Sequence, residues 1–212
     1  MISVIVIELT TPHGIARAHL MVAAGARAAV VLGHGAGGGI ASRDLTVSSD
    51  AALAEGLSVV LVEQPYRVAG RRAPAPTHQL DAAWTAVIAA LREDQLRGLP
   101  LIVGGRSSGA RVACRTAEAT GAVGVLCLAF PLRPPRHAGA VPAASRQAEL
   151  DAVTVPTLVV QGARDPFGIP RSGEHRTVVE VAGDHSLRTD LPAVSGAVAA
   201  WLPVILAQLD RS

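Results

Sequence analysis

The sequence predicts an α/β fold in which a mostly parallel sheet of about eight strands carries helices on both faces. Three observations predict it: half of the 212 residues are apolar, short β-type runs alternate with helical runs, and most of these β-type runs are apolar throughout. An unbroken apolar run indicates a strand that is covered on both faces, as in a parallel sheet. One domain over residues 1–212, with a single large core, is expected at this length.

The first two strands are expected to form an antiparallel pair. Ser3–Leu9 and Ile15–Val22 flank Pro12-His13-Gly14, a sequence that favours a tight turn. The other six strands are expected to run parallel, and each is a short, largely apolar run. They are Ala28–Leu32, Leu57–Val62, Leu101–Val103, Val123–Ala129, Thr157–Val160 and Thr177–Val181.

Helices are predicted between these strands. They are Asp44–Glu55, Leu80–Arg97, Ser108–Ala119, Ser145–Ala152 and Ala193–Leu209. Asp44 and Ser145 are expected to be N-caps, because their side-chain oxygens can accept the free N–H groups of a first helical turn. Gly56 and Gly98 are expected to end helices, since glycine adopts the left-handed conformation that commonly follows one.

Two proline-rich loops, Pro65–Pro76 and Pro131–Pro142, are the longest predicted gaps between elements. Neither is long enough for a cap domain, so we expect the carboxyl edge of the sheet to be open. Residues 191–209 carry no charge, but they are rich in alanine and contain two prolines. That composition is poor for a membrane span, and we interpret this segment as a terminal helix that packs on the sheet.

Charge and cysteine content exclude several classes of protein. Nineteen basic against seventeen acidic residues leave a net charge of +2, which is too small for a nucleic-acid-binding surface. Cys114 and Cys127 lie in apolar runs and are expected to be buried free thiols. The N-terminus lacks the basic region and cleavage site of a signal peptide, so we expect a cytoplasmic location with neither a nucleic-acid nor a membrane partner.

Ser107 is the candidate nucleophile. Gly105-Arg-Ser107-Ser-Gly109 follows an apolar strand and precedes a helical run, which is the context that the G-x-S-x-G turn requires. Such a turn holds the serine in a strained backbone conformation and lifts its hydroxyl above the sheet, at the positive end of the next helix. An ordinary strand–helix turn with a serine N-cap is the alternative interpretation.

A serine hydroxyl is a weak nucleophile, so it needs a base and an acid that orients the base. In this architecture the chain order is serine, acid, histidine. Asp165 follows the predicted strand Thr157–Val160, and His185 follows the last predicted strand. His175 precedes that last strand and is expected at the opposite end of the sheet. Asp184 is the alternative acid, although the side chains of neighbouring loop residues commonly diverge.

Backbone N–H donors for an oxyanion are expected in the glycine-rich loop Gly33–Gly39 and at the serine turn. We assign Ala36 and Ser108, each through its main-chain N–H group. A flexible loop is the alternative interpretation of the glycine cluster taken alone. Tyr66 and Leu132 are expected to line the substrate site.

Four glycine-containing motifs follow strands in the predicted order. They are Gly33-His-Gly-Ala-Gly37, Gly105-Arg-Ser-Ser-Gly109, Gly162-Ala-Arg-Asp165-Pro-Phe-Gly168 and Gly183-Asp-His185-Ser186. Together they resemble the α/β-hydrolase superfamily and, more narrowly, its small dienelactone-hydrolase-like branch, which includes the KANSL/TEX-type domains. The resemblance covers nearly the whole chain, and it implies the fold, a Ser-Asp-His triad and a serine hydrolase reaction. Ser108 stands where the family more commonly has Gly or Met, which leaves a backbone donor in place.

The expected function is hydrolysis of a small-molecule acyl substrate, an ester or a related compound, through attack by Ser107 and an acyl-enzyme. The alternative is a non-catalytic binding or scaffold protein, because a fold does not fix a function. No cofactor and no metal are expected. Arg71 and Arg72 lie in the first proline-rich loop and are interpreted as solvated charges, with capture of an anionic substrate as the alternative.

The glycine loop also matches a dinucleotide-binding fingerprint, Gly33-x-Gly35-x-x-Gly38, and Glu63 ends the next strand, where an acid could bind a ribose. We disfavour this interpretation because no helix is predicted to open at Gly38 and because the polar residues at the other strand ends stay unexplained. Metal-dependent hydrolysis is also disfavoured. Glu174-His175 and Asp184-His185 are adjacent pairs that lack the helical i, i+4 spacing of zinc ligands.

Overall fold

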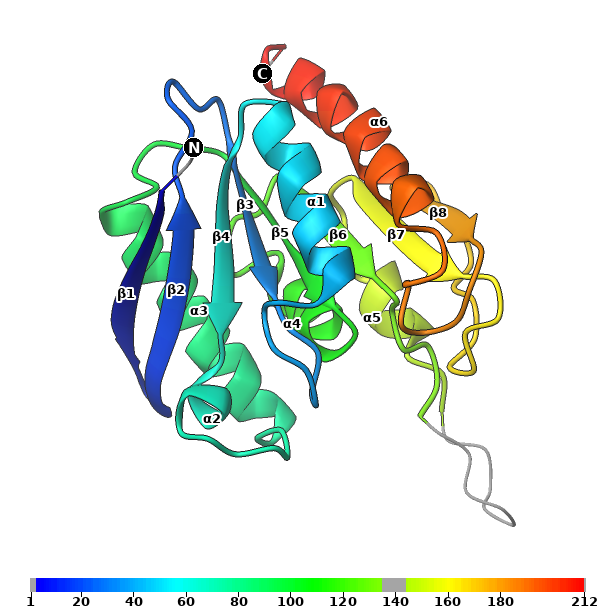
Figure 1. The fold of residues 1–212 in the computed structure, drawn as a ribbon, viewed down its shortest axis with the longest axis horizontal. Helices are drawn as coiled ribbons and strands as arrows, with labels where there is room; N and C mark the ends of the chain where they lie inside the picture. The colour runs from blue at the N-terminus through cyan, green and yellow to red at the C-terminus, as the bar shows by residue number, and fades with distance from the viewer. Residues whose placement is uncertain (1–2, 135–143, 212) are drawn as a thin grey trace.

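The computed structural model describes residues 3–134 and 144–211 of the chain. Its eight-stranded sheet has the order β1-β2-β4-β3-β5-β6-β7-β8 (Figure 1). The strands are β1 (Val4–Thr11), β2 (Gly14–Met21), β3 (Ala29–Gly33), β4 (Ser58–Glu63), β5 (Leu101–Arg106), β6 (Gly124–Leu128), β7 (Thr157–Gly162) and β8 (Arg176–Val181). β2 is antiparallel to both β1 and β4, and the remaining neighbours are parallel to one another.

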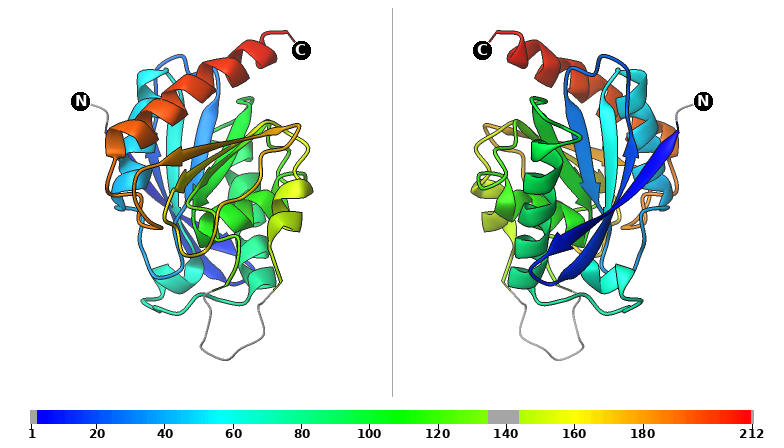
Figure 2. Two further views of the ribbon diagram at one scale, coloured as in Figure 1. Left: turned by 90° about the vertical axis from the view of Figure 1, so that its right-hand side faces the viewer. Right: turned by 90° about the vertical axis from the view of Figure 1, so that its left-hand side faces the viewer.

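Helices cover both faces of this sheet, as Figures 1 and 2 show. One face carries α1 (Arg43–Ala54) and α6 (Leu191–Leu209), and the other carries α3 (Thr77–Glu93), α4 (Ser108–Thr116) and α5 (Gln147–Asp151). The four-residue α2 (Pro65–Val68) follows β4 at its carboxyl end. The predicted mostly parallel sheet with helices on both faces is therefore confirmed.

The sequence pattern of α3 explains why it packs where it does. Leu80, Trp84, Val87, Ile88 and Leu91 recur at helical spacing, so they form one apolar stripe. All five are buried against the sheet, in the core cluster that also contains residues of β2, β4 and β5. Full burial of a side chain of this size contributes about 1.5–3 kcal/mol, which makes this stripe a main source of stability on its face.

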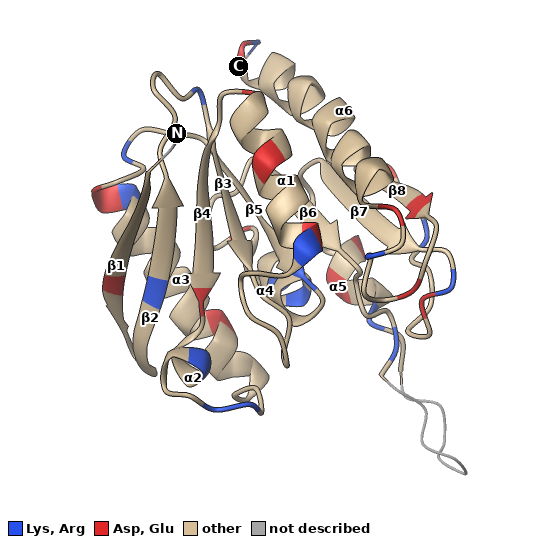
Figure 3. Cartoon of the chain, viewed as in Figure 1, with Lys and Arg blue, Asp and Glu red and all other residues tan. Residues whose placement is uncertain are grey.

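The terminal helix α6 packs in the same way on the opposite face. Val194, Val198, Leu202 and Ile205 are buried in the second core cluster, beside α1. This confirms the prediction that the segment packs on the sheet. Figure 3 shows no charged residue along α6. By length and composition the helix could cross a bilayer, and 28% of its most apolar 18-residue segment is buried.

Two expectations about helix N-caps are wrong. Asp44 is not the N-cap of α1: the helix begins at Arg43 after Ser42, and the Asp44 carboxylate is instead buried in an ion pair with Arg106. Arg146, not Ser145, is the residue that precedes α5, although the Ser145 hydroxyl accepts a hydrogen bond from the Gln147 N–H at 3.2 Å.

Other boundaries differ in ways that follow from local chemistry. α3 starts earlier than predicted, at Thr77, and ends at Glu93. The prediction that Gly98 ends this helix is therefore wrong, since Gly98, with φ 76°, lies at the end of the turn that follows. Gly56 follows the last residues of α1 with φ 75°, as predicted. The first proline-rich loop contains α2, which was not predicted; Pro65 suits its first turn, where no N–H is needed. Residues 135–143 of the second loop lie outside the described residues.

Candidate active site

The carboxyl ends of β5, β7 and β8 bring three polar side chains together. His185 Nε2 lies 3.0 Å from Ser107 Oγ, and His185 Nδ1 lies 2.7 Å from Asp165 Oδ2. The three residues are separated in the chain but follow strands that end at the same edge of the sheet. Hydroxyl, imidazole and carboxylate thus form a continuous hydrogen-bonded chain.

The turn that carries Ser107 has the strained geometry that the sequence predicts. Ser107 has φ 53° and ψ −110°, outside the regions that a non-glycine residue normally occupies, and it directly precedes α4. A Cβ atom at Gly105 would lie 2.4 Å from the Gly33 carbonyl oxygen, and one at Gly109 would lie 2.5 Å from it. Only glycine at these two positions lets β5 and α4 approach β3 closely enough to form this turn.

The carboxylate of Asp165 is buried and held at both oxygens. Its Oδ1 accepts the Phe167 N–H at 2.9 Å, and its Oδ2 accepts a hydrogen bond at 2.7 Å from Gln161 Nε2 in addition to facing His185. Gln161 is fully buried in β7 and also donates to the Phe130 and Gly168 carbonyls. These bonds fix the carboxylate in the orientation that reaches the imidazole.

Three residues around His185 were not singled out in the sequence: Gln161, Phe167 and Arg106. The Phe167 ring centroid lies 4.4 Å from that of His185, so the imidazole is packed on one side. Arg106 Nη2 donates to the His185 carbonyl oxygen at 3.0 Å. A usable signal existed for Gln161, since this polar residue directly follows the apolar run Leu158-Val-Val160 within a buried strand.

Arg106 also forms a buried ion pair. Its Nε lies 2.8 Å from Asp44 Oδ2, and the Asp44 side chain is 1% exposed. The remaining terminal nitrogen lies beside the glycine loop, because a Cβ at Gly35 would be 2.9 Å from Arg106 Nη1. One guanidinium therefore joins α1, the end of β5, the loop of His185 and the glycine loop.

The alternative acid and base lie elsewhere. The Asp184 carboxylate is exposed and accepts hydrogen bonds from the hydroxyl and N–H of Ser186, which hold the pKa of Asp184 below its ordinary value. The His175 carbonyl accepts the N–H of Thr157, the first residue of β7, so His175 lies at the amino edge of the sheet. Neither residue joins the chain of hydrogen bonds at Ser107.

The glycine loop after β3 lies next to the serine turn. A Cβ at Gly35 would be 3.5 Å from Ser107 Cβ, which places the loop backbone beside the nucleophile. Within residues 3–134 and 144–211, no acceptor is bonded to the N–H of Ala36 or of Ser108. Both N–H groups are thus free to donate; Ser108 directly follows Ser107 in the chain, and Ala36 directly follows Gly35.

Buried side chains hold this loop in place. The Gln64 N–H donates to His34 Nε2 at 3.1 Å, so His34 carries its proton on Nδ1, which donates to the Gly35 carbonyl at 2.9 Å. Burial lowers the pKa of His34 and keeps the ring neutral. The Tyr66 hydroxyl donates to the Ala36 carbonyl at 2.9 Å.

The two residues expected to line the substrate site occupy different surroundings. Tyr66 is buried beneath the glycine loop and borders two cavities, one of them next to Ser108. Leu132 is buried in the core, and its Cδ2 would contact a Cβ at Gly168, at 3.5 Å, beside the loop of Asp165.

The structure gives no support to the dinucleotide interpretation. The segment after Gly38 continues as a loop until α1 begins at Arg43, so no helix N-terminus faces the glycines. The Glu63 carboxylate is engaged by His19 Nε2 at 2.9 Å. Among the described residues, no group of three or more His, Cys, Asp or Glu side chains is placed to bind a metal ion.

Solved structures with the same architecture cover nearly the whole chain. A hydrolase without a lid from Xanthomonas campestris, described as an α/β serine hydrolase, has a TM-score of 0.69 and 21% identity over 95% of this chain and 96% of that chain. A dienelactone hydrolase from Anabaena variabilis has a TM-score of 0.73 and 16% identity over 96% of this chain and 98% of that chain. An α/β serine hydrolase homologue from Coxiella burnetii has a TM-score of 0.75 and 15% identity over 93% of this chain and 97% of that chain.

At these identities the likeness establishes the fold, and it confirms the predicted α/β-hydrolase fold. Residues 3–134 and 144–211 contain no inserted cap domain. No curated protein sequence is significantly similar to the chain. The sequence itself matches a family model, described as an alpha/beta hydrolase domain, over residues 26–193. Since this match spans more than half of the 212 residues, the chain belongs to the alpha/beta hydrolase domain family.

Proposed function

We propose that the protein is a serine hydrolase of the carboxylesterase type that cleaves small esters or related acyl compounds. The observation that carries this proposal is the hydrogen-bonded chain Asp165–His185–Ser107, with distances of 2.7 and 3.0 Å. A serine on a strained turn, a base within reach of its hydroxyl and a buried acid on the far side of the base are the requirements of acyl transfer. We place the chain in the dienelactone-hydrolase-like branch that includes the KANSL/TEX-type domains.

The first half of the reaction forms the acyl-enzyme. Ser107 Oγ attacks the carbonyl carbon while His185 Nε2 accepts the hydroxyl proton, and Asp165 stabilises the resulting imidazolium through Nδ1–H. The carbonyl oxygen becomes an oxyanion, to which the N–H groups of Ala36 and Ser108 donate; each such donor is worth about 2.7–4 kcal/mol in the transition state. The intermediate then collapses, and the imidazolium returns its proton to the departing alkoxide.

The second half frees the acid. A water molecule gives a proton to His185 Nε2 as its oxygen attacks the acyl carbon, and the new oxyanion uses the same two N–H donors. Cleavage of the bond to Ser107 Oγ returns the proton to the serine and releases the carboxylic acid. All protons are transferred by His185, so the reaction needs no cofactor.

The substrate class follows from the surroundings of the triad. Since no cap domain is present in the described ranges, the site suits small or protruding acyl substrates. We also propose a cytoplasmic location. Leu132 and Tyr66 are proposed as nearby walls, Leu132 beside the acid loop and Tyr66 beneath the loop that carries Ala36.

Turnover of p-nitrophenyl esters of graded acyl length tests the proposal. The wild-type protein is expected to hydrolyse the short-chain esters with a burst of p-nitrophenol, and Ser107→Ala is expected to lose activity by about 10⁴-fold or more. Equal rates for the wild type and Ser107→Ala on every ester would instead favour a non-catalytic binding or scaffold protein on the same fold.

A further inference from the structure

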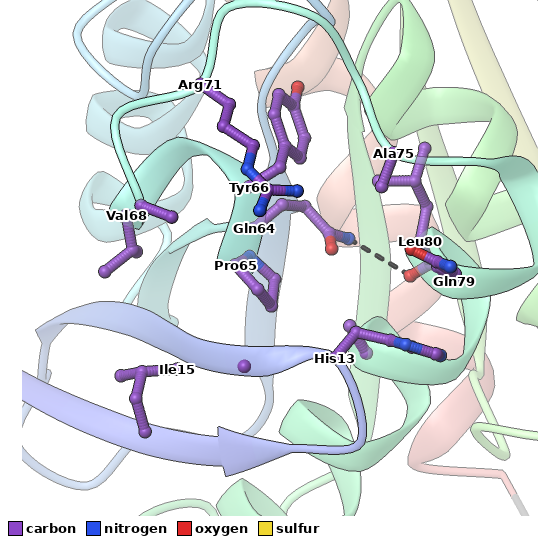
Figure 4. Close-up of a pocket in the computed structure, with 13 residues that line it drawn as sticks. His13, Ile15, Gln64, Pro65, Tyr66, Val68, Arg71, Ala75, Gln79 and Leu80 are labelled. Carbon is purple, nitrogen blue, oxygen red and sulfur yellow. Dashed lines mark hydrogen bonds between the residues drawn. The ribbon is translucent and has the colours of Figure 1, made fainter.

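A second cavity lies away from the triad, between the β1–β2 turn, α2 and the first turns of α3 (Figure 4). Its volume is about 320 Å³, which falls in the range of small-molecule sites. Ser107, Asp165 and His185 do not line it. The cavity is therefore separate from the triad, although it shares Tyr66 with the proposed substrate site.

A buried hydrogen-bond acceptor in the wall of this cavity has no partner. Gln64 is 6% exposed, and its Nε2 donates to the Leu80 carbonyl at 3.2 Å. That bond leaves Oε1 free, and no donor in the described parts of the chain reaches it. Figure 4 shows the Gln64 amide directed into the cavity beside Leu80. Buried acceptors are nearly always satisfied, so a ligand with an O–H or N–H group is the natural partner.

The electrostatic surroundings favour a negative charge. Arg71 lines the cavity, and Figure 4 shows its guanidinium extending over Gln64. Within residues 3–134 and 144–211, the Arg71 guanidinium has no ion-pair partner, and no acidic residue lines the cavity. Gln79 and Leu80, in the first turns of α3, also line the cavity. The N-terminus of this 17-residue helix carries a partial positive charge, which adds to the attraction for an anion.

The remaining walls are apolar. Ile15, Pro65, Val68, Leu80 and Ala83 supply carbon surface around the polar groups. A few placed polar groups in an otherwise apolar cavity are typical of sites that orient a small organic molecule. The ligand thus needs an apolar body in addition to its charge and its donor.

We propose that this cavity binds a small organic anion, a carboxylate that carries a hydroxyl or amide N–H donor beside an apolar group. The carboxylate pairs with Arg71, the donor reaches Gln64 Oε1, and the apolar group contacts Pro65 and Leu80. This site adjoins the glycine loop, because the Gln64 N–H donates to His34 Nε2 and the Tyr66 hydroxyl donates to the Ala36 carbonyl.

Calorimetric titration with three matched probes tests the proposal. Mandelate has a carboxylate, a hydroxyl and a phenyl group, whereas phenylacetate lacks the hydroxyl and 1-phenyl-1,2-ethanediol lacks the charge. We expect one mandelate to bind per chain, about tenfold or more tighter than either analogue. Ser107→Ala is expected to bind mandelate as the wild type does, so failure of this site and failure of the proposed hydrolase are separate results.

Variants assign the binding to the cavity. Arg71→Gln removes an exposed side chain and is expected to weaken mandelate binding about tenfold or more, with little effect on the diol. Arg72→Gln makes the same change in charge outside the cavity lining and is expected to leave affinity unchanged. Gln64→Leu is expected to abolish the preference for mandelate over phenylacetate.

Three results would overturn the proposal. The first is mandelate binding no tighter than the diol, and the second is an equal loss of affinity in Arg71→Gln and Arg72→Gln. The third is loss of mandelate binding in Ser107→Ala, which would place the ligand at the triad.

Discussion

The two neighbouring carboxylates near His185 differ in what they can do. Asp165 is buried and bonded to the imidazole, whereas Asp184 is exposed and bonded to Ser186. Adjacency in the chain therefore does not select the acid; the hydrogen bond from Nδ1 does.

Exchanging each acid for its amide separates their roles. Asp165→Asn is expected to lower kcat by about 10³- to 10⁴-fold, because an amide at this position favours the wrong imidazole tautomer. Asp184→Asn, the matched control, is expected to change kcat little, since its side chain is hydrogen-bonded to Ser186 and not to His185. Steady-state hydrolysis of p-nitrophenyl acetate measures both. A larger loss in Asp184→Asn than in Asp165→Asn would overturn the assignment.

Individual residues differ in how well the sequence predicts them. Ser107, Asp165 and His185 could be singled out because each follows a predicted strand and the chain order fits acyl transfer. Arg106 could not, because its partners are Asp44 and the His185 carbonyl, both distant in the chain. Asp44 was misassigned as an N-cap for the same reason: residue type suggests a cap, but only the tertiary fold supplies the guanidinium.

At the scale of elements, the Asp44–Arg106 pair fastens α1 to the end of β5. Arg106→Gln leaves a buried carboxylate without its counter-charge, and we expect the free energy of unfolding to fall by about 3–5 kcal/mol. The double variant Asp44→Asn/Arg106→Gln is expected to lose less than the sum of the two single variants, because it removes both charges. Urea denaturation of the four proteins measures this coupling. Strict additivity would show that the two side chains do not interact energetically.

The glycine loop depends on the protonation state of one histidine. Burial lowers the pKa of His34, and its Nε2 must remain an acceptor for the Gln64 N–H. Below about pH 6.5 the unfolded chain therefore binds a proton that the folded chain does not. Stability contributed by neutral His34 is fully present above that pH and is lost as the pH falls through the lowered pKa.

Urea denaturation at a series of pH values between 7 and 5 measures this effect. The wild type is expected to lose up to about 1.4 kcal/mol of unfolding free energy per pH unit from this group. His34→Asn is expected to be less stable at pH 7 but to show a smaller slope, since the titrating ring is gone. An identical slope in both proteins would contradict the inferred role of His34.

Elements were predictable where their patterns are strong. The apolar stripe of α3 and the continuous apolar runs of the buried strands indicate their structure directly. The four residues of α2 were missed because one helical turn in a proline-rich loop has no periodicity to detect. The start of α3 was placed too late because Thr77 and its neighbours are polar, and only the apolar face signals the helix.

At the scale of the whole molecule, the two cysteines report on global opening. Cys114 and Cys127 are buried free thiols with sulfur atoms 3.5 Å apart, and the hydrogen bond between Cys127 and Cys114, together with burial, raises the pKa of Cys127 well above its ordinary value. Only the thiolate reacts with alkylating agents. We expect native labelling by iodoacetamide at pH 8 to be slow and to accelerate with urea in step with global unfolding. Rapid labelling that is independent of urea would show local access instead.

The order of strands is the part of the architecture that the sequence leaves open. Alternation of elements predicts a parallel sheet, but not that β4 lies between β2 and β3 or that β2 is antiparallel to β4. The order of neighbouring strands depends on which face of the sheet each connecting helix covers. That choice is made by long-range packing, which a local sequence pattern does not reveal. The carboxyl-edge location of the site was predictable nonetheless, since it requires only that the strands be parallel.

Covalent labelling by a fluorophosphonate tests most directly whether the hydrogen-bonded chain at Ser107 is chemically active. The reagent phosphonylates a serine only when a neighbouring base activates its hydroxyl. The account predicts one adduct per wild-type chain by intact-mass spectrometry, located on Ser107, and no adduct in Ser107→Ala or His185→Ala. A wild-type protein that stays unlabelled under native conditions, while a control esterase is labelled, would contradict it.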